Sequence, residues 1–130
     1  MLPEEVNRDL EELRQIAGDV AADGGFSVND STFVQAEQFL IEAFAASDKL
    51  PSPFIGFGFD GRLVIEWFIK SGRELVVDID GGMAIAFLMV EIDAEGREVE
   101  TEAELLGDWT VAEVIRRLVY PEVREEDYEI

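Results

Sequence analysis

The sequence predicts a single α+β domain, an antiparallel β-meander of four or five strands packed with two N-terminal helices and one C-terminal helix. One observation behind this is the stretch 54–92, which is rich in Val, Ile, Phe and Trp and is interrupted by three glycine-containing pairs. Another is the helical periodicity on both sides of that stretch. The 130 residues suffice for one domain. We assign residues 1–120 to it and expect the acidic C-terminal tail, residues 121–130, to be mobile.

The three helices are predicted from apolar residues that recur at helical spacing. The first runs from residue 3 to about residue 20, and Pro3 suits a first helical position. The second runs from about residue 31 to residue 47. The third begins at a capping box of Thr110 and Glu113 and ends near Val119, before Pro121. Their expected buried residues include Val6, Leu10, Leu13, Ala17, Val20, Phe33, Ala36, Leu40, Phe44, Val114, Ile115 and Leu118.

The strands are predicted to be joined by tight hairpins at Asp60-Gly61, Ser71-Gly72 and Gly81-Gly82. If each pair forms a two-residue turn, the strand register follows by counting. One face then carries Ile55, Phe57, Val64, Phe68, Leu75, Val77, Ile79, Ala84, Ala86 and Leu88. The other carries Gly56, Gly58, Leu63, Ile65, Trp67, Ile69, Val76, Ile85, Phe87 and Met89, with Glu74, Asp78 and Asp80 among them. Both faces are rich in apolar residues, so either helices cover both or the Trp67 face is an interface.

Two further features of the sheet depend on this register. Glu66 would point into the face that carries Phe68 and Val77, where a carboxylate needs a basic partner. Lys70, Arg73 or another protein could supply that partner, unless the register is shifted by one residue. Residues 98–101 are predicted as a short fifth strand, whose alternating charges would discourage edge-to-edge pairing.

The charge of the chain is its main functional clue. Thirty Asp and Glu against ten Lys and Arg give a net charge of −20. A field of that sign repels nucleic acid and anionic membranes and attracts basic surfaces. Solubility, or a salt-rich cytoplasm, is an equally simple interpretation of the same charge.

Enzyme chemistry has little support in the sequence. The chain contains neither Cys nor His, which removes the thiol nucleophile and the commonest general base and metal ligand. Asp78 and Asp80 lie two residues apart on a predicted strand, but the apolar residues that follow do not fit an EF-hand. We therefore expect no enzymatic activity, no metal and no cofactor.

Targeting signals are also missing from the sequence pattern. No apolar run approaches the roughly 20 residues of a membrane helix. The first thirteen residues, MLPEEVNRDLEEL, are acidic and lack the basic and apolar regions of a signal peptide. We expect a cytoplasmic protein that contacts no membrane.

The stretch of roughly residues 10–80 resembles a group of small bacterial proteins that share a Pro…Asp-Gly…Glu-Trp signature. The matching residues are Pro51, Pro53, Asp60, Gly61, Glu66, Trp67 and Leu75. Some members are encoded beside toxin genes, and the resemblance implies an antitoxin-like role without catalytic residues. The group often has Trp-Asp-Gly where this chain has Ala22-Asp23-Gly24, so a role of that Trp does not carry over.

These observations lead to three functional hypotheses. The first is a non-enzymatic binding protein that neutralises a basic partner, such as a nuclease toxin, through acidic steering and apolar docking. The second is a nucleic-acid mimic that inhibits a defence or nucleic-acid-handling complex without binding nucleic acid itself. The third is a homodimeric structural subunit. The expected partner-binding residues are Ile65, Trp67, Phe87, Glu74, Asp78 and Asp80.

Overall fold

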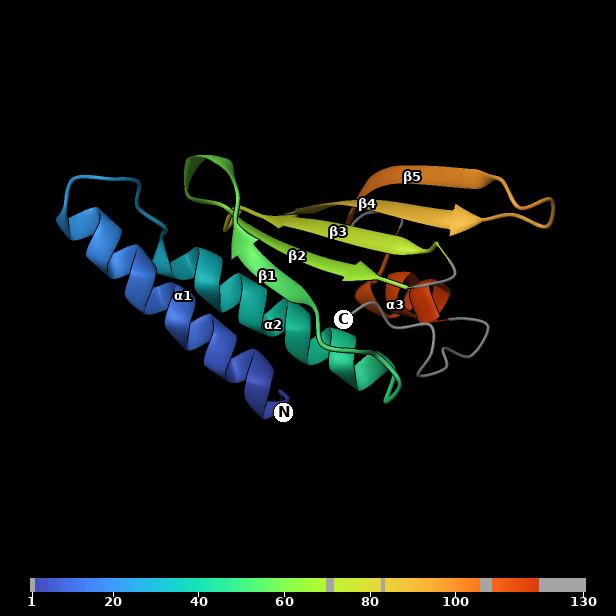
Figure 1. The fold of residues 1–130 in the computed structure, drawn as a ribbon, viewed down its shortest axis with the longest axis horizontal. Coiled ribbons are helices and arrows are strands. Elements are labelled where there is room, and N and C mark those ends of the chain that lie inside the picture. Colours follow the sequence, from blue (N-terminus) through green and yellow to red (C-terminus); the bar gives the residue numbers. More distant parts are fainter. Residues whose placement is uncertain (1, 70–71, 83, 106–108, 120–130) are drawn as a thin grey trace.

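The computed structural model describes residues 2–69, 72–82, 84–105 and 109–119 of the chain. Within these ranges three helices lie on one side of a five-stranded antiparallel sheet, so the α+β fold is confirmed (Figure 1). The helices are α1 (Glu4–Ala22), α2 (Asp30–Ala46) and α3 (Val111–Val119). The strands are β1 (Phe54–Phe57), β2 (Leu63–Phe68), β3 (Glu74–Ile79), β4 (Ile85–Ile92) and β5 (Glu98–Leu105). They pair in chain order as a meander.

The helices form where the sequence predicts them and bury most of the expected residues, whereas Leu13, Val20 and Phe44 are only half-buried. In α1, Glu4 and Glu5 lie in the first turn, where carboxylates complement the positive end of the helix dipole. The capping box before α3 is confirmed: Glu113 N donates to Thr110 Oγ1 at 3.2 Å, and Thr110 N donates to Glu113 Oε1 at 3.1 Å. The buried helical residues are Val6, Leu10, Ala17, Thr32, Phe33, Ala36, Phe39, Leu40, Ala43, Val114, Ile115 and Leu118.

The predicted strand register is wrong by one residue at each of the first three hairpins. Residue 57 pairs with residue 63, residue 67 with residue 75, and residue 77 with residue 87. The reason lies in the turns: each of the three pairs lies within a longer connection and does not form a two-residue turn. Gly61 and Gly72 have φ of +75° and +101°, the left-handed conformation that ends a three-residue loop. Accordingly, Gly58 N donates to Arg62 O at 2.9 Å, around the three residues 59–61.

Loop length decides which residues share a face of this sheet. Residues 58–62, 69–73, 80–84 and 93–97 connect the strands, and each connection has five residues. With an odd number of loop residues, every pair of facing residues has the same parity. Consequently, all odd-numbered strand residues point to one face and all even-numbered ones to the other.

The odd-numbered face packs on the helices and contains the core. Trp67 is 1% exposed, its ring centroid lies 6.0 Å from that of Phe39 in α2, and its Nε1 donates to Pro51 O at 2.7 Å. Burial of each large apolar side chain contributes about 1.5–3 kcal/mol. The fully buried strand residues on this face include Leu63, Ile65, Leu75, Val77, Ile79 and Met89. We call this side the covered face.

Candidate functional site

The even-numbered strand residues form a face that none of the described helices covers (Figure 1). We call it the open face. Its side chains are exposed or half-buried, with the exception of Val90 at 7% exposure, and Val90 lies outside the main core cluster. The open face consists of Phe54, Gly56, Val64, Glu66, Phe68, Glu74, Val76, Asp78, Ala86, Leu88, Val90, Ile92, Glu98, Glu100, Glu102 and Glu104.

An apolar stripe follows β4 along the open face. It consists of the four even-numbered residues of the strand, Ala86, Leu88, Val90 and Ile92. Val76 on β3 faces Leu88 and widens the stripe at its middle. The sequence places side chains of this kind on β4 because the strand has apolar residues at both parities, which is the pattern of a strand buried on both faces. Here the described structure covers only one of those faces.

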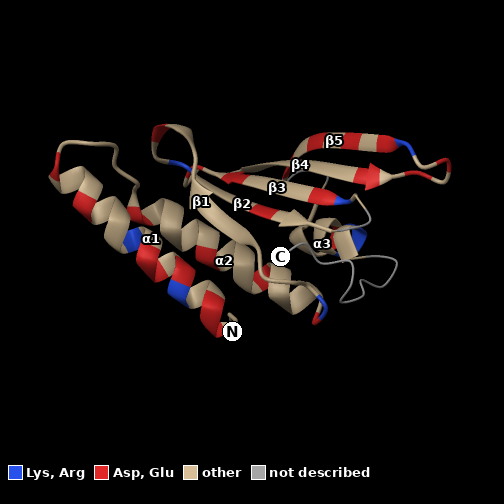
Figure 2. Cartoon of the chain, viewed as in Figure 1, with Lys and Arg blue, Asp and Glu red and all other residues tan. Residues whose placement is uncertain are grey.

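Two rows of carboxylates border this stripe. On one side β5 contributes a continuous row, because its sequence EVETEAEL places Glu at every even position. This row, which we call the β5 row, is Glu98, Glu100, Glu102 and Glu104. On the other side β3 contributes Glu74 and Asp78. The strand residues of the open face, all of which the structure describes, include seven acidic and no basic side chains (Figure 2).

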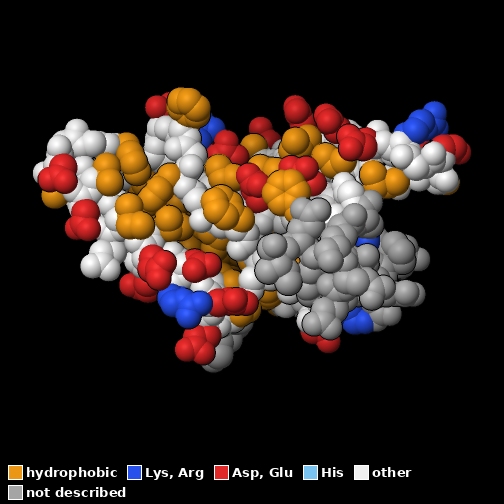
Figure 3. Space-filling view, in the orientation of Figure 1, with side chains coloured by type: hydrophobic (Ala, Val, Ile, Leu, Met, Phe, Trp, Pro, Cys, Tyr) orange, Lys and Arg blue, Asp and Glu red, His pale blue; other side chains and the backbone are white. Residues whose placement is uncertain are grey.

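The surface is hollowed between the two rows. A shallow depression of about 420 Å³ lies over β3, β4 and β5, and its lining includes the apolar residues Val76, Ala86 and Leu88 and the acidic residues Asp78, Glu102 and Glu104. Apolar and acidic side chains lie next to one another above these strands in the space-filling view (Figure 3). The depression is open to solvent, so it suits a side chain of another molecule better than an enclosed small ligand.

Glu74 lies among other carboxylates of the open face. The pKa of Glu74 lies above its ordinary value, first because of partial burial and then because of the negative charges of Glu66, Glu98 and Glu100. Arg62, in the connection between β1 and β2, donates to Asp78 Oδ2 at 3.1 Å. Asp78 Oδ1 is buried and has no partner among the described residues. The described strand residues of the open face therefore supply no positive charge to balance these carboxylates.

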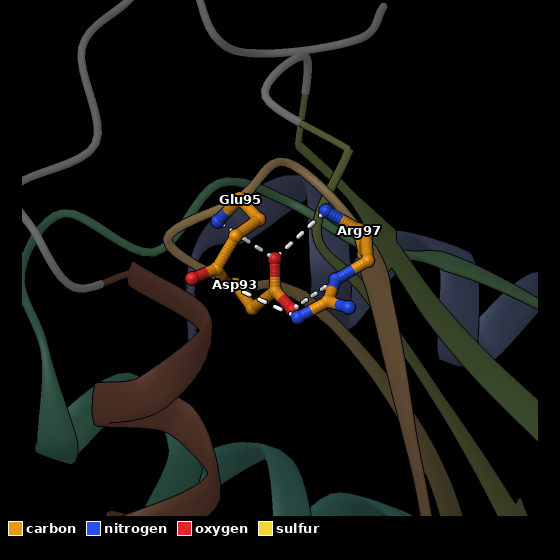
Figure 4. Close-up of polar contacts among 3 residues, drawn as sticks. All are labelled: Asp93, Glu95 and Arg97. Atoms are coloured by element: carbon orange, nitrogen blue, oxygen red, sulfur yellow. Dashed lines mark hydrogen bonds and ion pairs between the residues drawn. The ribbon is translucent and has the colours of Figure 1, made fainter.

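The β4–β5 turn holds the apolar stripe and the β5 row in register. Asp93 Oδ1 accepts from the backbone N–H groups of Glu95 and Arg97 at 2.9 and 2.8 Å. Asp93 Oδ2 accepts from Arg97 Nε at 3.0 Å, and Arg97 also reaches Glu95, as Figure 4 shows. Gly96, with φ of +79°, ends the loop. This short turn fixes which residue of β5 faces which residue of β4.

The structure places three of the six predicted binding residues in the core. Ile65, Trp67 and Phe87 are 0%, 1% and 4% exposed, respectively. In the observed register they share a face with Leu75 and Val77, and this face packs on the helices, so the expectation that the Trp67 face meets a partner is wrong. Phe87 packs edge-to-face on Trp109, with ring centroids 5.7 Å apart. All three side chains are therefore buried in this fold.

The acidic residues among the six lie elsewhere. Glu74 and Asp78 are together on the open face, whereas Asp80 lies in the β3–β4 connection, where its Oδ1 accepts from Gly82 N at 2.7 Å. Glu66 faces Val76 on the open face and is half-buried, which agrees with the alternative of a register shifted by one residue.

The predicted binding residues include neither the stripe on β4 nor the β5 row, of which the predicted fifth strand contains only Glu98 and Glu100. The sequence predicts β5 as residues 98–101, but the strand extends to Leu105 and pairs with the whole of β4. A signal was available, because the acidic residues of β2, β3 and β5 all fall on even positions. That shared parity predicts one polar-bordered face.

Other kinds of site find little support in the described ranges. No group of three or more acidic side chains there could hold a metal ion. None of the helices in those ranges is long and apolar enough to cross a membrane. Residues 121–130, expected to form a mobile tail, lie outside the described residues.

The chain was compared with protein-family models, with curated proteins and with solved structures, and no match was found.

Proposed function

We propose that this chain is an acidic, non-enzymatic binding protein that holds and neutralises a basic protein partner on the open face of its sheet. The observation that carries the proposal is the apolar stripe on β4 between carboxylates of β3 and β5. The partner would be a basic protein such as a nuclease toxin, in line with the antitoxin-like resemblance, and the complex would form in the cytoplasm.

The apolar part of the face supports docking. Phe54, Phe68 and Ile92 are 66%, 42% and 37% exposed, and they lie on the same face as Val64, Val76 and Leu88. Contiguous exposed apolar surface on a folded domain is typical of an interaction site. When a partner covers this surface, each Å² of apolar area removed from water contributes about 25 cal/mol of favourable free energy.

The acidic part supports a choice of partner. Partial burial and then the negative charges of Glu66, Glu98 and Glu100 raise the pKa of Glu74, so like charges repel one another at this position. A basic surface relieves this repulsion on binding, and the field also raises the rate of encounter. The carboxylates would thus select a basic partner and raise the association rate. The apolar stripe would slow dissociation of the complex.

Affinity capture with paired variants tests this proposal. The full chain, Leu88→Asn on the open face and Ile41→Asn on the exposed side of α2 are used as baits in lysate of the native cell. We expect a basic protein to be retained by the parent chain and by Ile41→Asn and lost from Leu88→Asn. Its association rate should fall steeply between about 50 and 300 mM salt. If Leu88→Asn retains the partner as well as the parent chain does, or if the association rate does not change with salt, the proposal is contradicted.

A second candidate function is nucleic-acid mimicry, which the β5 row favours. Alternate strand residues are about 6.6–6.8 Å apart, so the four glutamates form an evenly spaced line of charge along one strand. A mimic would use this line and would not need the stripe. Competition between duplex DNA and this chain for a captured partner, undiminished by Leu88→Asn, would favour mimicry over the first proposal.

A further inference from the structure

We infer that the partner segment seated on the open face is a basic amphipathic α-helix of about 13 residues that lies along β4. This inference rests on the proposed function and specifies the shape of its partner. The carboxylates of β3 and β5 define the width of the binding surface, and the stripe defines its length. The distribution of charge indicates which flank of the helix is the more basic.

The width of the binding surface matches one helix. Strands in a sheet are about 4.7–4.9 Å apart, so the carboxylates of β3 and β5 stand on strands about 10 Å apart with β4 between them. An α-helix with its side chains is about 10–12 Å in diameter. A helix centred over β4 would place its apolar side on the stripe and its two flanks above the two acidic rows.

The length of the binding surface sets the length of the helix. From Ala86 to Ile92 the stripe covers six residue steps, or about 20 Å. At 1.5 Å per residue, a helix of about 13 residues spans that distance, which is nearly four turns. Successive turns of the helix rise about 5.4 Å, against about 6.6–6.8 Å between neighbouring glutamates of the β5 row, and long Lys or Arg side chains can bridge this difference.

The two flanks of the binding surface differ in available charge. Arg62 already pairs with Asp78, whereas none of the β5 row has an ion-pair partner among the described residues. The flank of the helix above β5 should therefore be the more basic one. The depression over Val76, Ala86 and Leu88 offers room for one large apolar side chain of the helix.

Three peptides of identical composition test the shape of the partner. Each has 14 residues of Leu, Lys and Ala with blocked ends. The first places Leu at helical spacing with Lys on both flanks, the second alternates Leu and Lys, and the third is scrambled. Isotope-labelled full chain is titrated with each peptide. Backbone amide shifts locate the binding, and circular dichroism reports the gain of helix.

We expect the helical-period peptide to bind at least tenfold more tightly than either isomer, to gain helix and to shift amides of β3, β4 and β5. The triple variant Glu100→Gln/Glu102→Gln/Glu104→Gln should weaken it at least tenfold. The control Glu11→Gln/Glu12→Gln/Glu42→Gln removes the same charge from α1 and α2 and should change its affinity less than twofold.

Two outcomes would overturn the inference in different ways. If the alternating or scrambled peptide binds the open face as tightly, and Leu88→Asn removes that binding, the helical partner is wrong while the proposed function stands. If no peptide shifts amides of the open face at millimolar concentration, both the inference and the proposed function fail.

Discussion

The two faces of this sheet are built from alternate residues of the same five strands, yet they have opposite properties. The covered face is nearly all apolar and is held against three described helices. The open face interleaves an apolar stripe with seven carboxylates. Stability should therefore reside in the odd-numbered residues and recognition in the even-numbered ones. Substitutions that separate these two roles test that assignment most directly.

The largest expected difference is between Trp67 and Leu88. Trp67→Ala removes a buried ring and its hydrogen bond to Pro51, and we expect it to lower the free energy of unfolding by about 3–5 kcal/mol. Leu88→Ala on the open face should cost about 1 kcal/mol or less. Urea titrations of both variants provide the measurement. Equal losses would mean that the open face is a second core.

The β4–β5 turn should give the next largest effect, because it sets the register of the stripe against the β5 row. Asp93→Ala removes the acceptor of two backbone N–H groups and of the Arg97 side chain. We expect a loss of about 1–2 kcal/mol in unfolding free energy. Glu95→Ala, which removes a single exposed ion pair, should cost less than about 0.5 kcal/mol. If Asp93→Ala leaves the unfolding free energy unchanged, strand pairing alone fixes the register.

Loss of a helix cap tests how firmly the covered face is held near β4. Thr110→Ala removes the N-terminal cap of α3, and we expect about 1 kcal/mol of destabilisation. Thr110→Ser keeps the hydroxyl and should restore most of it. Thermal unfolding of the two variants gives the comparison. A loss with Thr110→Ser as large as with Thr110→Ala would assign the effect to the methyl group and not to the cap.

The smallest effect concerns pH and comes from Glu74. Its pKa is raised in the folded state, so the fold binds its proton more tightly than the unfolded chain does. Stability from this group is thus lost as pH rises through the ordinary pKa toward the raised one. Glu74→Gln should increase the unfolding free energy at pH 7 by a few tenths of a kcal/mol and flatten its decline over that range. Denaturant titrations at pH 4 to 7 would contradict this if the variant kept the parent's slope.

The fold was predictable to the extent that local chemistry determines it. Helical spacing around Phe33 and Leu40 and the Thr110–Glu113 capping box gave the helices, and the glycines gave the number of hairpins. The register was not predictable from the glycines alone. A glycine such as Gly72 fits both the second position of a two-residue turn and the last position of a three-residue loop, because both can require positive φ.

The candidate site was predicted only in part, for a related reason. The net charge and an apolar sheet face pointed to docking, and Glu74 and Asp78 are on the face that the structure leaves open. Trp67, the expected apolar centre of the binding surface, is buried. Leu88 lies at the centre of the apolar stripe on the open face. The full length of β5 was hidden because EVETEAEL has small apolar side chains and many carboxylates, which a local reading assigns to solvent.

The equal lengths of the connections between strands determine how this domain responds to insertions and deletions. Each of the four connections has five residues, so adding or deleting one residue in any of them reverses the parity of every later strand. A single-residue insertion in the 93–97 connection would direct the β5 glutamates toward the helices unless the loop absorbed it. A two-residue insertion would leave every side chain on its present face. Length variation in this protein should therefore be tolerated in steps of two residues.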